Sequence, residues 1–587
     1  MNEKNNTYDL TEIMGKMTAF KEKLSKTDVS VQNGKVKCFI SVGQKNKRAA
    51  VLRGIGNDKN TAFKMAQDKT LKYIKEKNIN PPWLKADFVT MEKKLARSEF
   101  MQLASVIKKY YFQYGIAFDV FYNHSFLQQE VNGACLIKYM EGEETNPDPD
   151  ETITGLAGIS IDLEQKKTRA ELNWKNINSH LKYIRGQAGT LSDDDVKDII
   201  IFQTKSCFFE ENAFYELGDG ELCCSRRKID VKSPELVRNL LVNSSRYLAS
   251  TVLDNGRFIY GYFSCYNKEI ASYNSVRHAL GVYSLSETYL VTKDQTLIEP
   301  IRKSLAYLVE TYIYTIKGYS FVVDYESNHE IKLGGLGVAV LAIVKYLEIF
   351  DEKEIYLPLL KQIGKGIRYM QDEITGRFTH VLHFPDLEVV ERFRIVYYSG
   401  EAAFALMRIY SVDKSDLWLE TVQKAFDYFI ENEYWKNSDH WLAYCTNELT
   451  AVIPEDRYFE FGLKNTFYNL NYIMKRITTW ATFLEMLMAA KTMIDHIEKQ
   501  GREYLLDGYD IEKFESALQI RAERQLNGIF FPELAMYFKS PETILWGVFI
   551  RHHTFRVRND DVAHHLSGYC HYLTEILLSD DIAGSES

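Results

Sequence analysis

The sequence has no disulfide framework and no run long enough to cross a membrane. Its 8 cysteines are spread over 587 residues, and only Cys223 and Cys224 are adjacent. Disulfide-stapled domains are short and dense in cysteine, so this usage favours a reducing compartment. No run of about 18 residues lacks charges, and "MNEKNNTYDLTEIMGKM" at the N-terminus lacks the apolar stretch of a signal peptide. We therefore expect a cytoplasmic protein with no membrane span.

Several motifs of common enzyme classes are also missing. The chain has no GxSxG elbow, no phosphate-binding P-loop and no GxGxxG fingerprint. Its net charge is −8, and no segment forms a basic stripe, so we expect no nucleic-acid partner. We expect no cofactor either. Aromatic residues, in contrast, make up 13 % of the chain, and such residues fill cores or line concave ligand sites.

The first 235 residues predict small α+β structure. In residues 1–140, alternating runs at 35–43 and 48–56 predict a strand pair, and a lysine-edged amphipathic helix follows at 60–78. Residues 141–235 predict an acidic, proline-bearing excursion and then a β-rich segment. This N-terminal region is a candidate docking site for a partner enzyme.

From residue 236 the pattern becomes a helical repeat. Turn residues Gly256, Gly318, Gly376 and Asn437 are separated by 62, 58 and 61 positions. A fixed period of this length fits one helical hairpin with its loops. Segments 476–497 and 520–538 predict a fifth and a sixth unit.

Two kinds of helix alternate within this repeat. One kind is rich in small residues and apolar on nearly every face, which indicates burial; the other kind is amphipathic. The first kind is predicted at 276–291, 334–350, 400–412 and 440–452. Buried inner helices alternating with amphipathic outer helices predict an α/α toroid of about six hairpins over residues 236–580, so the chain is mainly α-helical.

The starts of the inner helices are the best candidates for a site. In a toroid these helices run parallel, so their N-termini gather at one mouth, where unpaired N–H groups favour anionic or oxygen-rich ligands. Charged and aromatic side chains recur at this point of successive units. The candidate catalytic residues are His278, Glu401, Asp439, His440 and His564. The candidate substrate-binding residues here are Arg277, Asp324, Lys332, Arg394, Tyr397, Tyr398 and Trp441.

These residues have expected roles and an alternative explanation. Glu401 and Asp439 would be acid/base carboxylates, the histidines proton carriers, the cations anion clamps and the aromatic rings stacking platforms. The alternative is that they only cap helices, which would account for Asp439. Capping does not account for Arg277 or Lys332, because a cation at a helix N-terminus is unfavourable unless it faces an anion.

The stretch "HHTFRVRNDDVAHHLSGYCHY" at 552–572 carries five of the 13 histidines. Its alternation places Arg556 and Arg558 on one side of a strand. A helix starting near residue 559 or 560 would pair Asp560 with His564 and Asp561 with His565, one turn apart. Three interpretations stay open: caps and surface pairs, funnel-lining groups that include Arg556, Arg558 and Asp561, or a metal site that adds His552 or His553.

The helical region resembles the six-hairpin glycosidase-like superfamily, which includes unsaturated glucuronyl hydrolases and sugar 2-epimerases. The resemblance lies in the "GRF" loops, the "GG…A…LA" inner helices and the "YYSGEAAFALMRIY" unit, over about 60 % of the chain. It implies a saccharide-active funnel lined by acids. Lanthionine cyclases are a rival toroid family, whose zinc ligands would correspond to Cys265 and to Cys570 with His571. The glycine expected after each of these two motifs, "SCYN" at Cys265 and "YCHY" at Cys570 and His571, is absent here.

We therefore expect a carbohydrate-active enzyme that works on an acidic sugar or a surface-polysaccharide unit by carboxylate and histidine acid–base chemistry. The reaction would be hydrolysis, elimination or epimerisation. The first alternative is a non-catalytic binding or scaffold protein for polymer biosynthesis. The second is a zinc-dependent cyclase of the lanthionine type.

Overall fold

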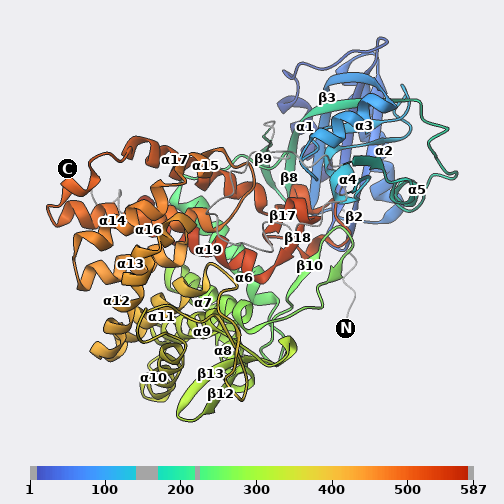
Figure 1. Cartoon of the computed structure of the whole chain (residues 1–587). Coiled ribbons are helices and arrows are strands. Elements are labelled where there is room, and N and C mark those ends of the chain that lie inside the picture. Colours follow the sequence, from blue (N-terminus) through green and yellow to red (C-terminus); the bar gives the residue numbers. More distant parts are fainter. Residues whose placement is uncertain (1–8, 141–168, 219–221, 223–224, 579–587) are drawn as a thin grey trace.

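The computed structural model describes residues 9–140, 169–218, 222 and 225–578. The acidic excursion expected at 141–155 lies outside these residues. An N-terminal α+β part and a larger ring of helices are visible as separate bodies of structure that meet at one side (Figure 1).

The N-terminal part is built on one antiparallel sheet. The predicted strand pair is present as β1 (Val36–Gln44) and β2 (Lys47–Gly56), and α2 (Lys59–Lys77) packs on both. In the described part of residues 9–218 the main path of the sheet is β2-β1-β3-β8-β4-β5, with β9 paired to β8. The other strands of this sheet are β3 (Trp83–Ala96), β4 (Gly115–Ala117), β5 (Ser125–Phe126), β8 (Asp198–Glu210) and β9 (Ala213–Glu216).

Strand β8 shows that the two predicted N-terminal segments are not structurally separate. The sequence pattern places residues 198–210 in the second segment, but β8 lies between β3 and β4 and pairs with β3 from Asp198 to Glu210. The described residues on either side of 141–168 therefore share one sheet. The smaller elements of this part are α1 (Leu10–Lys23), α3 (Arg97–Val106), α4 (Gln128–Gly133), β6 (Ile137–Met140), β7 (Arg169–Leu172) and α5 (Trp174–Tyr183).

The helical part is a closed ring of hairpins. Over residues 234–572, all of which the structure describes, six inner helices each pack on the next, and the last packs on the first. The inner helices are α7 (Ser275–Thr292), α9 (Leu333–Leu347), α11 (Tyr398–Asp413), α13 (His440–Val452), α16 (Thr482–Lys499) and α19 (Asn559–Tyr572). The outer helices are α6 (Pro234–Ser250), α8 (Ile298–Tyr312), α10 (Lys353–Tyr369), α12 (Asp416–Glu431), α14 (Asp456–Phe467) and α17 (Ile511–Gln525). This arrangement confirms the predicted α/α toroid.

Small residues let the inner helices approach one another closely. Helix α9 buries every residue except Lys345 and Leu347. A Cβ atom on Gly334 would lie 2.0 Å from Oε2 of Glu401, and one on Gly337 would lie 2.7 Å from the Glu401 backbone. Glycine is thus required for α9 to pack against the first turn of α11.

The sixth unit differs from the prediction. Residues 520–538 do not supply an inner helix; they form the end of α17 and the short helix α18 (Pro532–Ala535), and α19 completes the ring instead. The apolar residues after α18 are used elsewhere. Met536 and Tyr537 pack with Trp83 of the N-terminal sheet, and Ala49 N–H donates to the Met536 carbonyl at 2.7 Å.

A second small sheet leads into α19. Its order is β11-β10-β18-β17, formed by β10 (Gly261–Phe263), β11 (Lys268–Glu269), β17 (Phe549–Ile550) and β18 (Arg556–Arg558). The pairing of β10 with β18 joins the first hairpin of the ring to the last. In the described residues no helix is both long enough and apolar enough to cross a membrane.

Candidate functional site

The N-terminal ends of the inner helices meet at one mouth, as predicted. At the start of α7, Ser275 N–H donates to Asp324, which precedes α9, at 2.7 Å. At the start of α19, the Asn559 side chain donates to the Arg277 carbonyl of α7 at 3.1 Å. These contacts place the starts of α7, α9 and α19 side by side, so these three inner helices run parallel.

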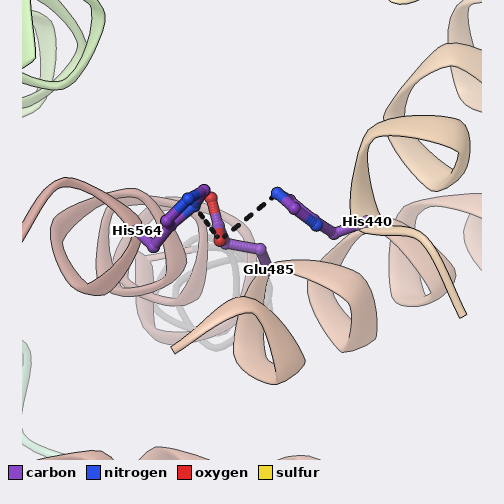
Figure 2. A group of neighbouring side chains, drawn as sticks. All are labelled: His440, Glu485 and His564. Atoms are coloured by element: carbon purple, nitrogen blue, oxygen red, sulfur yellow. Dashed lines mark hydrogen bonds and ion pairs between the residues drawn. The ribbon is translucent and has the colours of Figure 1, made fainter. Parts of the chain in front are cut away.

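Two histidines and a glutamate from three inner helices form the centre of this mouth (Figure 2). His564 Nδ1 lies 2.9 Å from Oε2 of Glu485, and His440 Nε2 lies 4.0 Å from the same oxygen. The two imidazole rings are 5.1 Å apart and nearly perpendicular, at 82°. Among the described residues, these three side chains make a group whose potential metal-ligand atoms all lie within 4.8 Å of one another.

The two histidines have different environments. His440 is 1 % exposed, and neither of its ring nitrogens has a hydrogen-bond partner among the described residues. Burial lowers the pKa of His440, and the neighbouring His564 lowers it further. Burial also disfavours the charged form of His564, but the carboxylate of Glu485, followed by those of the two aspartates at the start of α19, outweighs burial and raises the pKa of His564. One imidazole is thus held neutral while the other favours the cation.

Glu401 and Asp439, the predicted acid/base carboxylates, are buried next to this centre. Asp439 is 0 % exposed and accepts the Trp441 N–H at 2.8 Å, which is the capping role that the alternative explanation assigned to it. Burial raises the pKa of Asp439, and Glu401 adds to the shift. Burial also raises the pKa of Glu401 to about 8. Asp439 Oδ1 is 3.9 Å from His440 Nδ1, so Asp439 is a neighbour of the histidine.

The predicted anion clamps already face carboxylates of the same chain. Arg277 Nε lies 2.7 Å from Asp560, and Arg558 Nε lies 3.1 Å from Asp560 and 3.2 Å from Asp561. The expectation that cations at these helix starts must face an anion is met, but each of these anions is internal.

The mouth has a second group of ion pairs beside α9 and α11. Lys332 Nζ is 3.0 Å from Asp324, and Arg394 holds Glu330 with two nitrogens at 2.8 and 2.9 Å. Glu330 is also 3.6 Å from Lys332. Cations and carboxylates are therefore paired in this group, and their charges nearly cancel.

Three predicted pairings or positions are wrong. His564 pairs with Glu485 on a neighbouring helix and not with Asp560, because Asp560 is held by two arginines. His565 does not pair with Asp561: it is 0 % exposed, lacks a hydrogen-bond partner among the described residues, and burial lowers its pKa to about 3. His278 points away from the mouth, toward the outer layer, where it contacts the Tyr273 hydroxyl at 2.7 Å and the Ser304 carbonyl at 2.8 Å.

Of the predicted aromatic platforms, Tyr397 and Trp441 contact the histidine pair, and Tyr398 faces a different histidine. The Tyr397 ring is 5.3 Å from the His440 ring, whereas Tyr398 faces His380 at 5.5 Å. Trp441 is 1 % exposed and packs among rings of the inner helices, so it fills the core beneath the site. Arg556 is 8 % exposed on β18, and burial lowers its pKa.

The residues of the cyclase alternative are not assembled. Cys265 donates to the Thr554 carbonyl at 3.5 Å, whereas Cys570 contacts the Thr288 hydroxyl at 3.7 Å on α7. His571 lies between Glu287, at 3.4 Å, and Glu575, at 2.5 Å. The rings of His552 and His553 pack edge to face in a short turn before β18. Neither set forms a three-ligand group in the part of the chain that the structure describes.

The sequence pattern does not single out Glu485, the residue that faces both histidines. A signal existed: Glu485 is the fourth residue of α16, as Glu401 is the fourth residue of α11. Glutamates at the same position in two inner helices are expected at the same depth below the mouth.

No protein-family model and no curated protein sequence matches the chain. Solved structures that resemble it include a sugar epimerase from a ruminal bacterium, 12 % identical, with a TM-score of 0.47, covering 58 % of this chain and 99 % of its own. Cellobiose 2-epimerase from Bacillus thermoamylovorans B4167 is 12 % identical, with a TM-score of 0.45, over 58 % of this chain and 99 % of its own. An unsaturated glucuronyl hydrolase specific for heparin is 9 % identical, with a TM-score of 0.42, over 58 % of this chain and 97 % of its own. The likeness is distant, and the ring of six hairpins in residues 234–572, all of them described, rests on its own helix packing.

Proposed function

We propose that the toroid is an enzyme that moves a proton at a carbon next to the carbonyl group of a sugar, as an epimerase or isomerase does. The observation that carries this proposal is the pair of imidazoles, His440 and His564, that face the same glutamate at the centre of the mouth. Histidine is the side chain best suited to take and give protons near neutral pH.

The geometry favours proton transfer over hydrolysis by a carboxylate pair. Glycoside hydrolysis needs two carboxyl groups that flank the scissile bond, one of them beside a water or acting as nucleophile. Asp439 is fully buried and one of its oxygens accepts the Trp441 N–H as a helix cap, so it has no exposed oxygen to place beside a water or a sugar carbon. His564, in contrast, keeps a side chain that is 19 % exposed at the mouth. In the proposed step one imidazole takes the carbon-bound proton and the other donates to the substrate oxygen, so no net proton is gained or lost.

The charged residues around the mouth fit a ligand with many hydroxyl groups. These paired carboxylates and cations offer both donors and acceptors, which suits hydroxyl groups that do both. The resemblance seen in the sequence also implies a saccharide. Because Arg277, Arg558, Lys332 and Arg394 each face internal carboxylates, a neutral sugar is favoured over the acidic sugar expected from the sequence.

Exchange of a carbon-bound proton with solvent tests this proposal. The full chain, in EDTA and D₂O, is incubated with mannose, glucose, N-acetylglucosamine, cellobiose and glucuronate, and loss of the proton next to the carbonyl carbon is followed by NMR. We expect exchange with at least one neutral sugar. His440→Gln and His564→Gln should each abolish it.

His496→Gln is the matched control, because His496 lies in the last turn of α16, at the far end of an inner helix from the mouth. It should keep the wild-type rate. Exchange that survives both site variants, or exchange limited to glucuronate, would contradict the proposed centre or the proposed neutral substrate, respectively.

A further inference from the structure

We propose that His440, Glu485 and His564 also form a binding site for a divalent transition-metal ion of the Zn²⁺ class. Each residue comes from a different inner helix, α13, α16 and α19, so the closed ring of the toroid holds the set together. Two imidazoles and one carboxylate are a common three-ligand set for zinc in proteins, with the fourth position left open.

The spacing of the three side chains is close to what zinc needs. Tetrahedral ligands about 2.1 Å from a zinc ion are separated from one another by about 3.4 Å. The two distances to Glu485 Oε2 are 2.9 Å from His564 and 4.0 Å from His440, on either side of that value. The third spacing, between the ligand nitrogens of the two histidines, is no more than 4.8 Å, so side-chain movements of about 1 Å would bring all three onto one ion.

His440 provides an independent indication of a ligand. A buried polar group normally has a hydrogen-bond partner, because leaving it unsatisfied costs free energy. His440 is 1 % exposed, yet both ring nitrogens lack a partner among the described residues. Its Nε2 faces Glu485, while Nδ1 faces Asp439 at 3.9 Å. Metal-bound histidines typically donate the N–H of the second nitrogen to a carboxylate, and Asp439 is the carboxylate on that side of His440.

The donor set selects the class of ion. Ca²⁺ and Mg²⁺ prefer shells made of oxygen atoms, so two imidazoles disfavour them. His564 is the most exposed of the three side chains, at 19 % against 2 % and 1 %, so an ion would reach the set from the side of His564.

Metal binding would have a consequence for catalysis. A ring nitrogen that coordinates Zn²⁺ is no longer available to take or give a proton, so the ion should inhibit the proposed sugar reaction. This consequence depends on the proposed function, whereas the binding itself does not.

The test measures binding of ZnCl₂ alone to the full chain, after treatment with EDTA and removal of the chelator. Calorimetry is expected to show one tight zinc ion per chain, and thermal unfolding should move to higher temperature as the ion stabilises the folded state. MgCl₂ and CaCl₂ should produce neither effect. His440→Gln and Glu485→Gln should each weaken zinc binding by about 100-fold, since even outer-shell partners contribute about 10- to 100-fold.

His571→Gln is the control, because His571 contacts two carboxylates without forming a three-ligand group. It should leave zinc affinity unchanged. X-ray absorption of the wild-type zinc complex does not depend on any variant folding. It should show only nitrogen and oxygen ligands near about 2.0–2.1 Å.

Absence of zinc binding would overturn the proposal. Sulfur ligands in the absorption spectrum, or wild-type affinity in both site variants, would also overturn it, because either result places the ion elsewhere. Sugar exchange is measured in EDTA, so its failure leaves the zinc result intact, and the reverse also holds.

Discussion

Arg277 and Asp560 join the first inner helix of the toroid to the last. Arg277 Nε at the start of α7 lies 2.7 Å from Asp560 Oδ2 at the start of α19. Arg558 approaches the same aspartate at 3.1 Å. Burial opposes ionisation of Asp560, but Arg558 and Arg277 outweigh it and lower the pKa of Asp560. A charged carboxylate is therefore held between two cations where the ring closes.

We expect Asp560→Asn to lower the free energy of unfolding by about 2–3 kcal/mol. Removing one partner from a fully buried ion pair costs about 3–5 kcal/mol, and Arg277 retains 31 % exposure of its side chain, which reduces the cost. Urea denaturation measures this loss. Asp427→Asn breaks an exposed pair with Arg457, whose side chains are 59 % and 44 % exposed, and should cost less than about 1 kcal/mol. Equal losses in the two variants would contradict a closing role for Asp560.

Gly334→Ala should destabilise the protein although alanine favours helices. The added Cβ would lie 2.0 Å from Glu401 Oε2 and 2.4 Å from a Tyr398 ring carbon, and overpacking of this kind costs about 1–3 kcal/mol. Gly15→Ala in α1 is the matched control, because no atom lies within 4 Å of its added Cβ. Gly15→Ala should stabilise by about 0.5–1 kcal/mol. Melting temperatures that shift in the same direction for both variants would argue against close packing of α9 on α11.

Glu401 makes stability depend on pH. Burial raises the pKa of folded Glu401 to about 8, from 4.5 for an ordinary glutamate. Between these values the unfolded chain has released the proton that the folded chain retains, so the contribution of Glu401 to stability falls as pH rises from about 4.5 to 8. Chemical denaturation at several pH values should show that Glu401→Gln becomes more stable relative to wild type across this window. A constant difference between the two proteins would show that the Glu401 pKa is not raised.

The contact between the two parts of the chain depends on Arg227 and Glu533. Arg227 Nε and Nη2 lie 3.1 and 2.8 Å from Glu533 Oε2, and both residues are at least 96 % buried, with 4 % and 0 % exposure. Glu533→Gln should cost about 3 kcal/mol, because it leaves a buried guanidinium with weaker compensation. Limited proteolysis should then cleave around residues 225–235 faster than in wild type. Cleavage at an unchanged rate would indicate that the contact does not hold the two parts together.

Local pattern was sufficient to predict the ring but not its last member. The all-round apolar character of the segments that become α7, α9, α11 and α13 is a property of each segment alone, so periodicity detects it. Helix α19 buries Asn559 and His565 and carries Asp560, Asp561 and His564 in its first two turns, which hides that character. Segment 520–538 was predicted as the sixth unit, but its residues Met536 and Tyr537 pack with the N-terminal sheet instead.

The central contact of the site could not be predicted for a similar reason. Spacing along one helix suggested Asp560 as the partner of His564, since residues four apart share a face. Which carboxylate pairs with His564 depends on the side chains that neighbouring helices contribute. Two arginines hold Asp560 and a glutamate from α16 approaches His564, so competition between helices decided the pairing.

Helix α19 is synthesised after the other five inner helices, which has a consequence for folding during translation. A ribosome that has reached residue 558 has produced five of the six inner helices described here, and still neither His564 nor the carboxylate that receives Arg277. The nascent ring is open, with the apolar side of α7 that will meet α19 uncovered. We therefore expect a chain truncated before residue 559 to leave the ring open and to aggregate through this uncovered surface.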